Sequence, residues 1–192
     1  EICTKHGILL IFDEVITGFG RVGKATASEY FGVTPDLITM AKAINNASIP
    51  MGAVAASRTV HDTIVNGGAQ GAIELFHGYT YSAHPAAVAA AIATLDLYRS
   101  EGLFERAASL APTFEAAVHS LRGAKHVKDI RNLGMIAGIE LESRDGAPGA
   151  RAYEAFVKCF EAGVLVRFTG DILAFSPPLI INEEQIAHLF KT

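Results

Sequence analysis

The chain has few cysteines and few charged residues, and it has no long apolar run. Its two cysteines, Cys3 and Cys159, supply neither a disulfide framework nor metal-ligand spacing, and free thiols suit a reducing, cytoplasmic compartment. Only 19% of the residues are charged, the formal net charge is −4, and the basic residues are scattered. No apolar stretch approaches the roughly 20 residues that span a bilayer. We therefore expect neither nucleic acid nor a membrane as a partner.

The composition that remains is that of a globular protein. Half of the 192 residues are hydrophobic, which is enough for a buried core and argues against disorder. Residues 1–6 read as the end of a helix that runs into Gly7, not as a signal peptide, so we expect the chain to begin inside a domain. The texture changes at Gly102. We place a domain boundary near residue 100, with an α/β domain over residues 1–100 and an α+β domain over residues 101–192.

The pattern of apolar runs and turn residues predicts the main elements of both domains. Pro85 should stand in the first turn of the helix that follows it. The expected strands are Ile8–Phe12, Leu37–Met40, Gly52–Ala56, Val127–Arg131, Met135–Leu141, Val164–Arg167 and Ile172–Ser176. The expected helices are Ala86–Arg99, Leu103–Leu121, Arg151–Ala162 and a last one capped by Asn182.

Two charged residues end apolar runs and are the strongest functional signal. Asp13 closes the run 7–13 and Lys42 closes the run 36–42, so both read as residues at the C-terminal ends of buried strands. Ligands of open α/β sheets bind at that edge. A desolvated lysine amine can condense with an aldehyde, and a carboxylate can hold a heteroaromatic nitrogen protonated. The pair indicates pyridoxal phosphate (PLP) chemistry. Taken alone, Asp13 could equally belong to a solvated acidic loop, and Lys42 could equally be an ordinary surface lysine.

Two further segments carry candidate binding residues. In the stretch 77–85, Thr80 and Ser82 could donate to a phosphate ahead of a helix, or could belong to an ordinary N-terminal cap. His77 and His84 lie seven residues apart, and the stretch 77–85 contains no carboxylate or cysteine partner for them, so no metal site is expected.

Arg167 follows Val166 and precedes a turn that contains Asp171. The guanidinium could grip a substrate carboxylate with two hydrogen bonds, or could form a structural salt bridge to Asp171.

Taken together, these segments resemble the class III aminotransferases, PLP enzymes of fold type I. The resemblance follows order and spacing along essentially the whole chain, through the phrases at residues 11–21, 36–42, 49–54, 77–85, 166–171 and 176–179. It implies the second part of the PLP-binding large domain over residues 1–100, followed by a small C-terminal domain over residues 101–192.

The resemblance also implies roles for single residues. Lys42 would form the internal aldimine with PLP and shuttle the proton, while Asp13 would pair with the pyridine nitrogen. Val15 would pack on one face of the ring. Thr80 would bind the cofactor phosphate in the site of the partner subunit, because active sites of this family lie at a homodimer interface.

The branch of the family is indicated by Ile16, where many members have glutamine. With isoleucine at this position, the chain resembles the ω-amino acid:pyruvate and amine:pyruvate branch. In that branch, the arginine at the position of Arg167 binds the carboxylate of the acceptor. The implied reaction is transamination between an ω-amino acid or primary amine and a 2-oxo acid, with pyruvate as the expected acceptor. A 4-aminobutyrate- or ornithine-type aminotransferase and an aminomutase are the alternatives.

The sequence has no counterpart of the N-terminal half of the family, which includes the turn that holds the phosphate and the aromatic residue that stacks on the ring. The last helix, ending at Thr192, also reads as cut short. A catalytically incompetent remnant is therefore a further alternative, and the chain is expected to carry the lysine with only part of the pocket.

Overall fold

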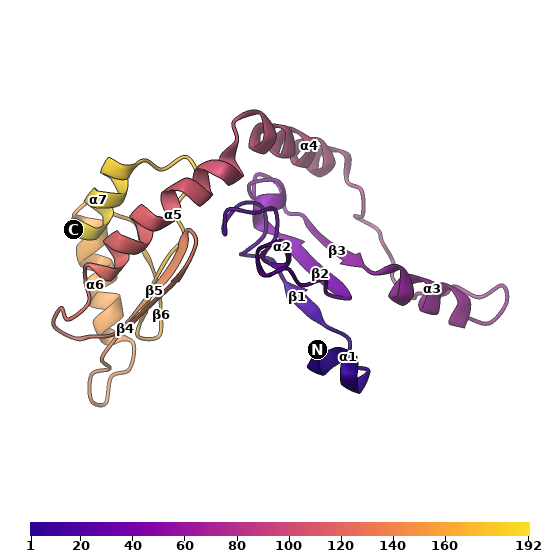
Figure 1. Cartoon of the computed structure of the whole chain (residues 1–192), viewed down its shortest axis with the longest axis horizontal. Coiled ribbons are helices and arrows are strands. Elements are labelled where there is room, and N and C mark those ends of the chain that lie inside the picture. Colours follow the sequence, from indigo (N-terminus) through magenta and orange to yellow (C-terminus); the bar gives the residue numbers. More distant parts are fainter. The chain divides into compact units, whose positions relative to one another are not determined.

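The computed structural model describes residues 1–192, and the chain divides into two compact units. The first unit contains residues 1–19 and 25–102, and the second contains residues 20–24 and 103–192. The mixed α/β class expected from the sequence is confirmed, because helices alternate with two separate sheets (Figure 1). No helix has the length and apolar character needed to cross a membrane.

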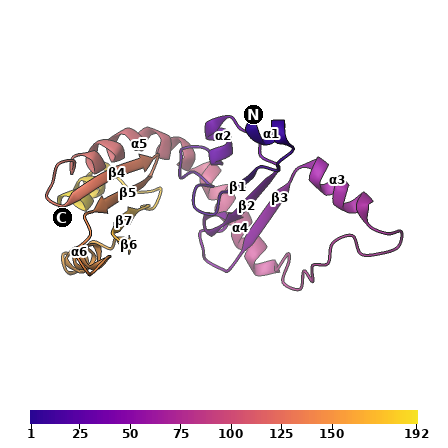
Figure 2. The ribbon, with the colours of Figure 1, turned by 90° about the horizontal axis from the view of Figure 1, so that it is seen from below.

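The first unit is built on a three-stranded sheet with the order β1-β2-β3 (Figure 2). β1 (Ile11–Asp13) runs parallel to β2 (Leu37–Ala41), which pairs antiparallel with β3 (Gly52–Ala56). The helices of this unit are α1 (Ile2–His6), α2 (Ala27–Phe31), α3 (Arg58–Gly67) and α4 (Pro85–Ser100), with the 3-10 turn η1 (Lys42–Ile44) directly after β2. Pro85 occupies the first turn of α4, as expected.

β1 is shorter than the sequence predicted. The N–H of Ile8 donates to the carbonyl of Cys3 at 2.9 Å, because Gly7 ends α1 in the left-handed conformation. The N–H of Leu10 donates to Asp36 Oδ2 at 2.8 Å. The N–H groups of Ile8 and Leu10 are therefore bound by a helix end and a side chain, and pairing with β2 begins only at Ile11.

The second unit has a four-stranded antiparallel sheet with the order β4-β5-β7-β6. Its strands are β4 (Val127–Leu133), β5 (Ile136–Leu141), β6 (Arg167–Thr169) and β7 (Ile172–Phe175), and its helices are α5 (Leu103–His119), α6 (Ala150–Glu161) and α7 (Glu183–Lys191). Alternate residues of β5 and β7 are buried, as a sheet with one covered face requires. Phe114, Met135, Ile139 and Ile186 are fully buried and form the centre of the core.

One predicted strand of this unit is wrong. Val164 and Val166 are buried on either side of the exposed Leu165, which gives the alternation of a strand, yet residues 164–166 pair with no other strand. The N–H of Val164 donates to the carbonyl of Cys159 at 2.8 Å, which ties this segment to the end of α6. Pairing starts at Arg167, which therefore opens β6 instead of ending a strand.

The excursion of residues 20–24 into the second unit depends on glycine. Gly20 has a φ of 97°, and an added Cβ would lie 2.5 Å from the ring of Phe104. Gly134, in the β4–β5 turn, has a φ of 54°, and its Cβ would lie 2.7 Å from the carbonyl oxygen of Arg21. The N–H of Met135 donates to that oxygen at 2.9 Å, so the excursion packs directly on the turn.

Candidate active site

The sheet brings Asp13 and Lys42 to the same edge. Asp13 is the last residue of β1, and Lys42 follows Ala41, the last residue of β2. These strands are parallel, with Asp13 paired to Thr39, so both functional side chains leave the carboxyl ends of neighbouring strands. This is the edge at which open α/β sheets bind ligands. The sequence predicted this placement.

Asp13 has one engaged and one open oxygen. Its Oδ1 accepts hydrogen bonds from the N–H of Val15 at 3.1 Å and from the hydroxyl of Thr39 at 3.0 Å. Its Oδ2 has no donor within the chain. A carboxylate held in this way presents a single oxygen as an acceptor, which fits the protonated ring nitrogen of PLP.

Lys42 lies in an unusual backbone conformation. Its φ is 48°, in the left-handed region that residues with a Cβ rarely adopt. The carbonyl of Lys42 accepts the N–H of Ala47 at 2.8 Å, and the carbonyl of Ala43 accepts the hydroxyl of Tyr98, from α4, at 2.7 Å. Such strained positions persist where the surrounding structure fixes them, and they cluster at functional sites.

The Lys42 side chain makes no ion pair or hydrogen bond, so its amine is available to an aldehyde. The donor set of this edge, an unpaired amine and a carboxylate with one open oxygen at the ends of neighbouring strands, therefore fits PLP. One expectation is wrong for this chain by itself: Asp13 and Lys42 are exposed, not buried. β1 is an edge strand, and its residues Ile11 and Asp13 are not covered by other parts of the 192 residues.

Glu14 is a buried charged residue that the sequence did not single out. It is only 1% exposed, and its carboxylate accepts the N–H groups of Ala27 at 2.9 Å and Ser28 at 2.8 Å, in the first turn of α2. The hydroxyl of Thr17 donates to the same carboxylate at 2.5 Å. Glu14 thus fixes the loop that follows Asp13. The available signal was a carboxylate at a strand exit ahead of a helix whose N-cap is Thr26.

Asn45 is a second polar residue that was missed. It is 1% exposed, and its Nδ2 donates to the carbonyl of Ile49 at 2.7 Å, which closes the loop after Lys42. Its Oδ1 is buried without a hydrogen-bond partner. A buried polar side chain that closes a loop next to Lys42 holds the backbone conformation of that loop.

Val15 and Ile16 lie in the loop between Asp13 and α2. Val15 is half-buried and its N–H contacts Asp13, whereas Ile16 is 47% exposed. The roles expected for them, packing against the ring and indicating the branch of the family, stay predictions.

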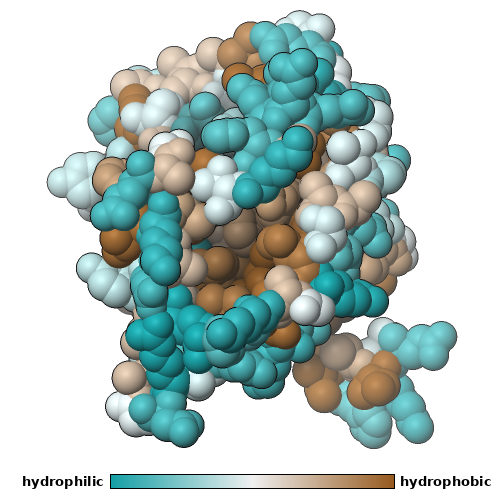
Figure 3. Space-filling model, turned by 90° about the vertical axis from the view of Figure 1, so that its left-hand side faces the viewer, coloured by the Kyte–Doolittle hydropathy of each residue, from teal (hydrophilic) through white to brown (hydrophobic).

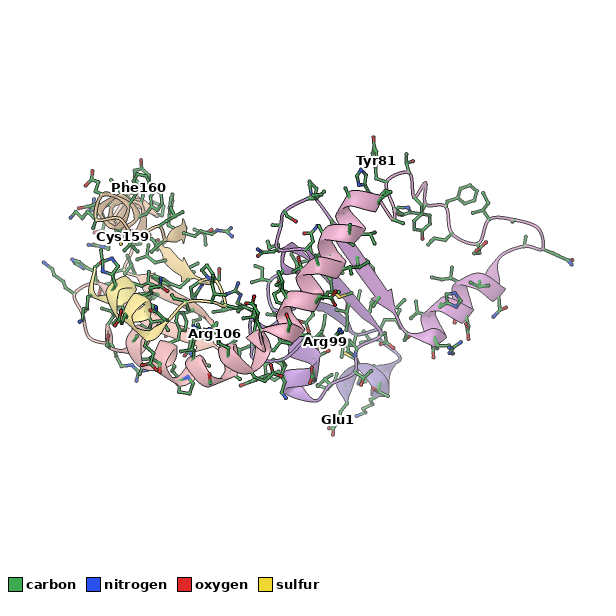
Figure 4. All side chains as sticks on the ribbon, turned by 90° about the horizontal axis from the view of Figure 1, so that it is seen from above. Glu1, Tyr81, Arg99, Arg106, Cys159 and Phe160 are labelled. Atoms are coloured by element: carbon green, nitrogen blue, oxygen red, sulfur yellow. The ribbon has the colours of Figure 1, made fainter.

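Thr80 lies in an exposed segment that borders a cavity of about 690 Å³. The cavity is lined by residues 77–84 on one side and by residues 50–52 on the other. Gly52 is the first residue of β3 and pairs with Ala41, the residue before Lys42. The cavity that the Thr80 segment lines is therefore also lined by the strand partner of Ala41. The ring of Tyr81 is 85% exposed and points away from the ribbon (Figure 4). The phosphate-binding role of Thr80 stays a prediction.

Arg167 belongs to the second unit, where it lines a cavity of about 610 Å³ together with apolar side chains, among them Phe156 and Phe168. The face in Figure 3 shows a hollow with hydrophobic side chains inside and hydrophilic side chains around it. The alternative prediction of a salt bridge to Asp171 is wrong. Arg167 forms no ion pair, and Asp171 Oδ1 instead accepts the N–H of Gly149 at 2.8 Å.

The resolved pKa shifts belong to residues of the second unit. The hydrogen bond from Lys128, followed by one from Arg131, holds the pKa of Glu140 below its usual range. Burial raises the pKa of the Cys159 thiol. No three histidine, cysteine, aspartate or glutamate side chains gather as a group that could hold a metal ion.

Comparison with known proteins agrees with this geometry. The model of the family "Aminotransferase class-III" matches residues 1–192. The chain is 61% identical to an omega-aminotransferase of Caulobacter vibrioides, over 100% of this chain and 43% of that protein. It is 50% identical to a beta-alanine–pyruvate aminotransferase of Pseudomonas aeruginosa, over 99% of this chain and 43% of that protein.

Among solved structures, the omega transaminase from Pseudomonas jessenii in complex with PMP superposes with a TM-score of 0.87 at 31% identity, and the match covers 99% of this chain and 43% of that chain. The chain thus spans less than half the length of the relatives that it matches. Because a family model covers every residue and the fold agrees, the chain belongs to the class III aminotransferases.

Proposed function

We propose that the protein carrying this chain is a PLP-dependent aminotransferase that moves an amino group from an ω-amino acid or a primary amine to a 2-oxo acid, with pyruvate as the acceptor. Class III aminotransferases are PLP-dependent. The names of the relatives, an omega-aminotransferase and a beta-alanine–pyruvate aminotransferase, support this choice of donor and acceptor. The observation that carries the proposal is the shared edge of β1 and β2, where β1 ends at Asp13, which has one open oxygen, and β2 leads directly into Lys42.

Each residue at this edge has a distinct task. When bound, PLP supplies an aldehyde carbon and a ring that withdraws electrons from the substrate carbon. Asp13 Oδ2 accepts a hydrogen bond from the ring nitrogen and keeps the proton there. The Lys42 amine removes and returns the proton at the substrate carbon, as a general base held by the loop 42–49. Val15 packs against the ring face and limits its tilt.

The test of this proposal is Lys42→Ala in the protein expressed from its complete reading frame. We expect the formation of alanine from pyruvate and an amine donor to fall by at least about 10²-fold, the lower range for loss of a general base. Borohydride reduction in the presence of PLP should label Lys42 in the wild type. Lys5→Ala is the matched control, because Lys5 is also an exposed lysine of the first unit. Alanine formation that persists in Lys42→Ala would contradict the assignment.

Product analysis separates the alternative reactions. A transaminase yields alanine from pyruvate, whereas an aminomutase leaves pyruvate unchanged and isomerises the donor. Preference for 2-oxoglutarate over pyruvate would point instead to a 4-aminobutyrate- or ornithine-type enzyme.

We further propose a cytoplasmic homodimer in which Thr80 binds the cofactor phosphate in the site of the partner subunit. Support comes from the exposed position of Thr80, whose neighbours in the segment 77–84 are also exposed, and from its hydroxyl, which has no hydrogen-bond partner in the chain. Mixed dimers of Lys42→Ala and Thr80→Ala subunits test this arrangement. If Thr80 acts across the interface, each mixed dimer regains one complete site and its tight PLP binding. If Thr80 acts in its own subunit, mixing restores nothing.

A further inference from the structure

Thr39 contacts the carboxylate that the proposed function assigns to the ring nitrogen. It is the β2 residue paired with Asp13, and its Oγ1 donates to Asp13 Oδ1 at 3.0 Å. The backbone carbonyl of Thr39 accepts the N–H of Glu14 at 2.9 Å. One residue of β2 therefore holds both the side chain of Asp13 and the backbone that follows it.

The position of the Thr39 hydroxyl is itself well fixed. Thr39 lies in the central strand of the sheet, paired with Asp13 on one side and with Val54 of β3 on the other. A β-branched side chain has few accessible χ1 rotamers, so a fixed backbone also fixes the hydroxyl. The same strand ends at Ala41, directly before Lys42, so β2 positions both the Thr39 hydroxyl and the lysine.

We infer that Thr39 is a positioning residue of the active site, acting through Asp13; this inference rests on the proposed function. With Oδ1 engaged by Thr39 and by the N–H of Val15, the carboxylate cannot rotate freely, and Oδ2 is the oxygen directed to the ring nitrogen. Without the hydroxyl, the carboxylate keeps only one donor and turns more freely about its last torsion. The proton on the ring nitrogen is then held less well, and PLP binds less tightly.

The test compares three substitutions in the protein expressed from its complete reading frame. Thr39→Val removes the hydroxyl and keeps the branched shape, Thr39→Ser keeps the hydroxyl and loses the methyl, and Thr39→Cys replaces the hydroxyl by a poor donor. Thr94→Val is the matched control, because the half-buried hydroxyl of Thr94 donates only to the carbonyl of Ala90, at 2.8 Å, and does not touch Asp13.

The readouts are the dissociation constant of PLP and the pH dependence of the ¹⁵N chemical shift of bound PLP labelled at its ring nitrogen. We expect Thr39→Val to weaken PLP binding roughly tenfold, which is 1.4 kcal/mol, and to release the ring proton at lower pH than the wild type does. Thr39→Ser should behave as the wild type, and Thr94→Val should change neither quantity. If Thr39→Val fails to fold, Thr39→Cys takes its place and should show the same direction of change.

Two results would overturn the inference: a ring-nitrogen titration in Thr39→Val or Thr39→Cys equal to that of the wild type, or equal losses in Thr39→Ser and Thr39→Val. The second result would mean that shape matters and the hydroxyl does not. Borohydride labelling separates this outcome from failure of the proposed function. Labelled Lys42 with an unchanged nitrogen titration contradicts only the role of Thr39, whereas a wild-type protein in which Lys42 is not labelled contradicts the aminotransferase assignment itself.

Discussion

The buried carboxylate of Glu14 offers the most direct test of how the loop after Asp13 is held. We consider Glu14→Ala in the protein expressed from its complete reading frame. In the wild type, the carboxylate accepts the N–H groups of Ala27 and Ser28. The next N–H of α2, that of Glu29, is accepted by the hydroxyl of Thr26, and the N–H of Tyr30 by the carbonyl of Thr26. The start of α2 is therefore fully satisfied, half of it by Glu14.

The magnitude follows from the groups that alanine leaves behind. The N–H groups of Ala27 and Ser28 would lose their acceptors in a buried setting, at about 1–3 kcal/mol each. Loss of a negative charge at a helix N-terminus adds about 0.3–1 kcal/mol. Thr17 is half-buried, and its hydroxyl can turn to water at little cost. We therefore expect the free energy of unfolding to fall by roughly 4 kcal/mol. With an unfolding entropy of about 2.1 cal/mol/K per residue, this shifts Tm by about 10 °C in a cooperative unit the size of this chain and by about half as much in a unit twice as long.

Scanning calorimetry of the variant, with and without PLP, measures this shift. Glu115→Ala is the matched control, because Glu115 is an exposed glutamate of α5 without a hydrogen-bond partner. Its stability should change by no more than about 0.5 kcal/mol. A Tm for Glu14→Ala within about 1 °C of the control would refute the reasoning, because two buried N–H groups without acceptors must cost more than that.

Three further predictions concern the second unit. Arg167→Ala should raise the KM for pyruvate roughly 30-fold, equivalent to about 2 kcal/mol, without slowing the half-reaction of a carboxylate-free amine; equal losses in single-turnover assays of both halves would contradict the role. The pKa of Glu140 is lowered by Lys128 and Arg131, so its stabilising effect is present above its ordinary pKa of 4.5 and is lost on acidification below that value. The difference in Tm between Glu140→Gln and the wild type should therefore shrink from pH 7 to pH 3, and a constant difference would argue against the ion pairs. Burial raises the Cys159 pKa above its ordinary 9.0, so iodoacetamide should alkylate this thiol at pH 8 more slowly than it alkylates free cysteine, as peptide mass spectrometry would measure.

Local patterns were sufficient for much of the fold. β3 has the predicted bounds, Gly52–Ala56, and α4 begins at the proline that was expected in its first turn. α5 begins at Leu103, as predicted, and carries Phe114 and Val118 on its buried face. These elements are encoded by apolar periodicity and by single turn residues, which are properties of neighbouring positions. The placement of Asp13 and Lys42 at one edge followed from the same kind of evidence, because both end apolar runs.

The supporting contacts could not be read in this way because they join distant positions. Thr39 meets Asp13 across 26 residues, and Glu14 meets Ser28 across 14. Arg106 of α5 donates to the carbonyls of residues 179–181, the last of these at 2.7 Å across 75 residues (Figure 4). A hydroxyl, a carboxylate or a guanidinium at such positions has the same appearance in the sequence as a solvated one. The wrong strand prediction at 164–166 has the same cause. Its burial alternates as in a strand, but the N–H of Val164 donates to the carbonyl of Cys159 at the end of α6.

The loop between Asp13 and α2 is held by hydrogen bonds at several points. Residues 20–24 of the loop belong to the second unit. On either side of them, the N–H of Phe19 donates to the carbonyl of Ala25 at 2.7 Å, and we call this hydrogen-bonded pair the neck of the loop. Within the excursion, Arg21 donates to the carbonyl of Pro177 and accepts from Met135.

The base of the same loop is held by Glu14, which also lies next to Asp13. Loss of Glu14 therefore removes the anchor between the neck and the sheet, while the contacts of residues 20–24 remain. If order at Asp13 comes from this anchor, Glu14→Ala should weaken PLP binding even at temperatures where the variant is fully folded. If order comes from the pairing of β1 with β2 alone, PLP binding should be unchanged while Tm falls.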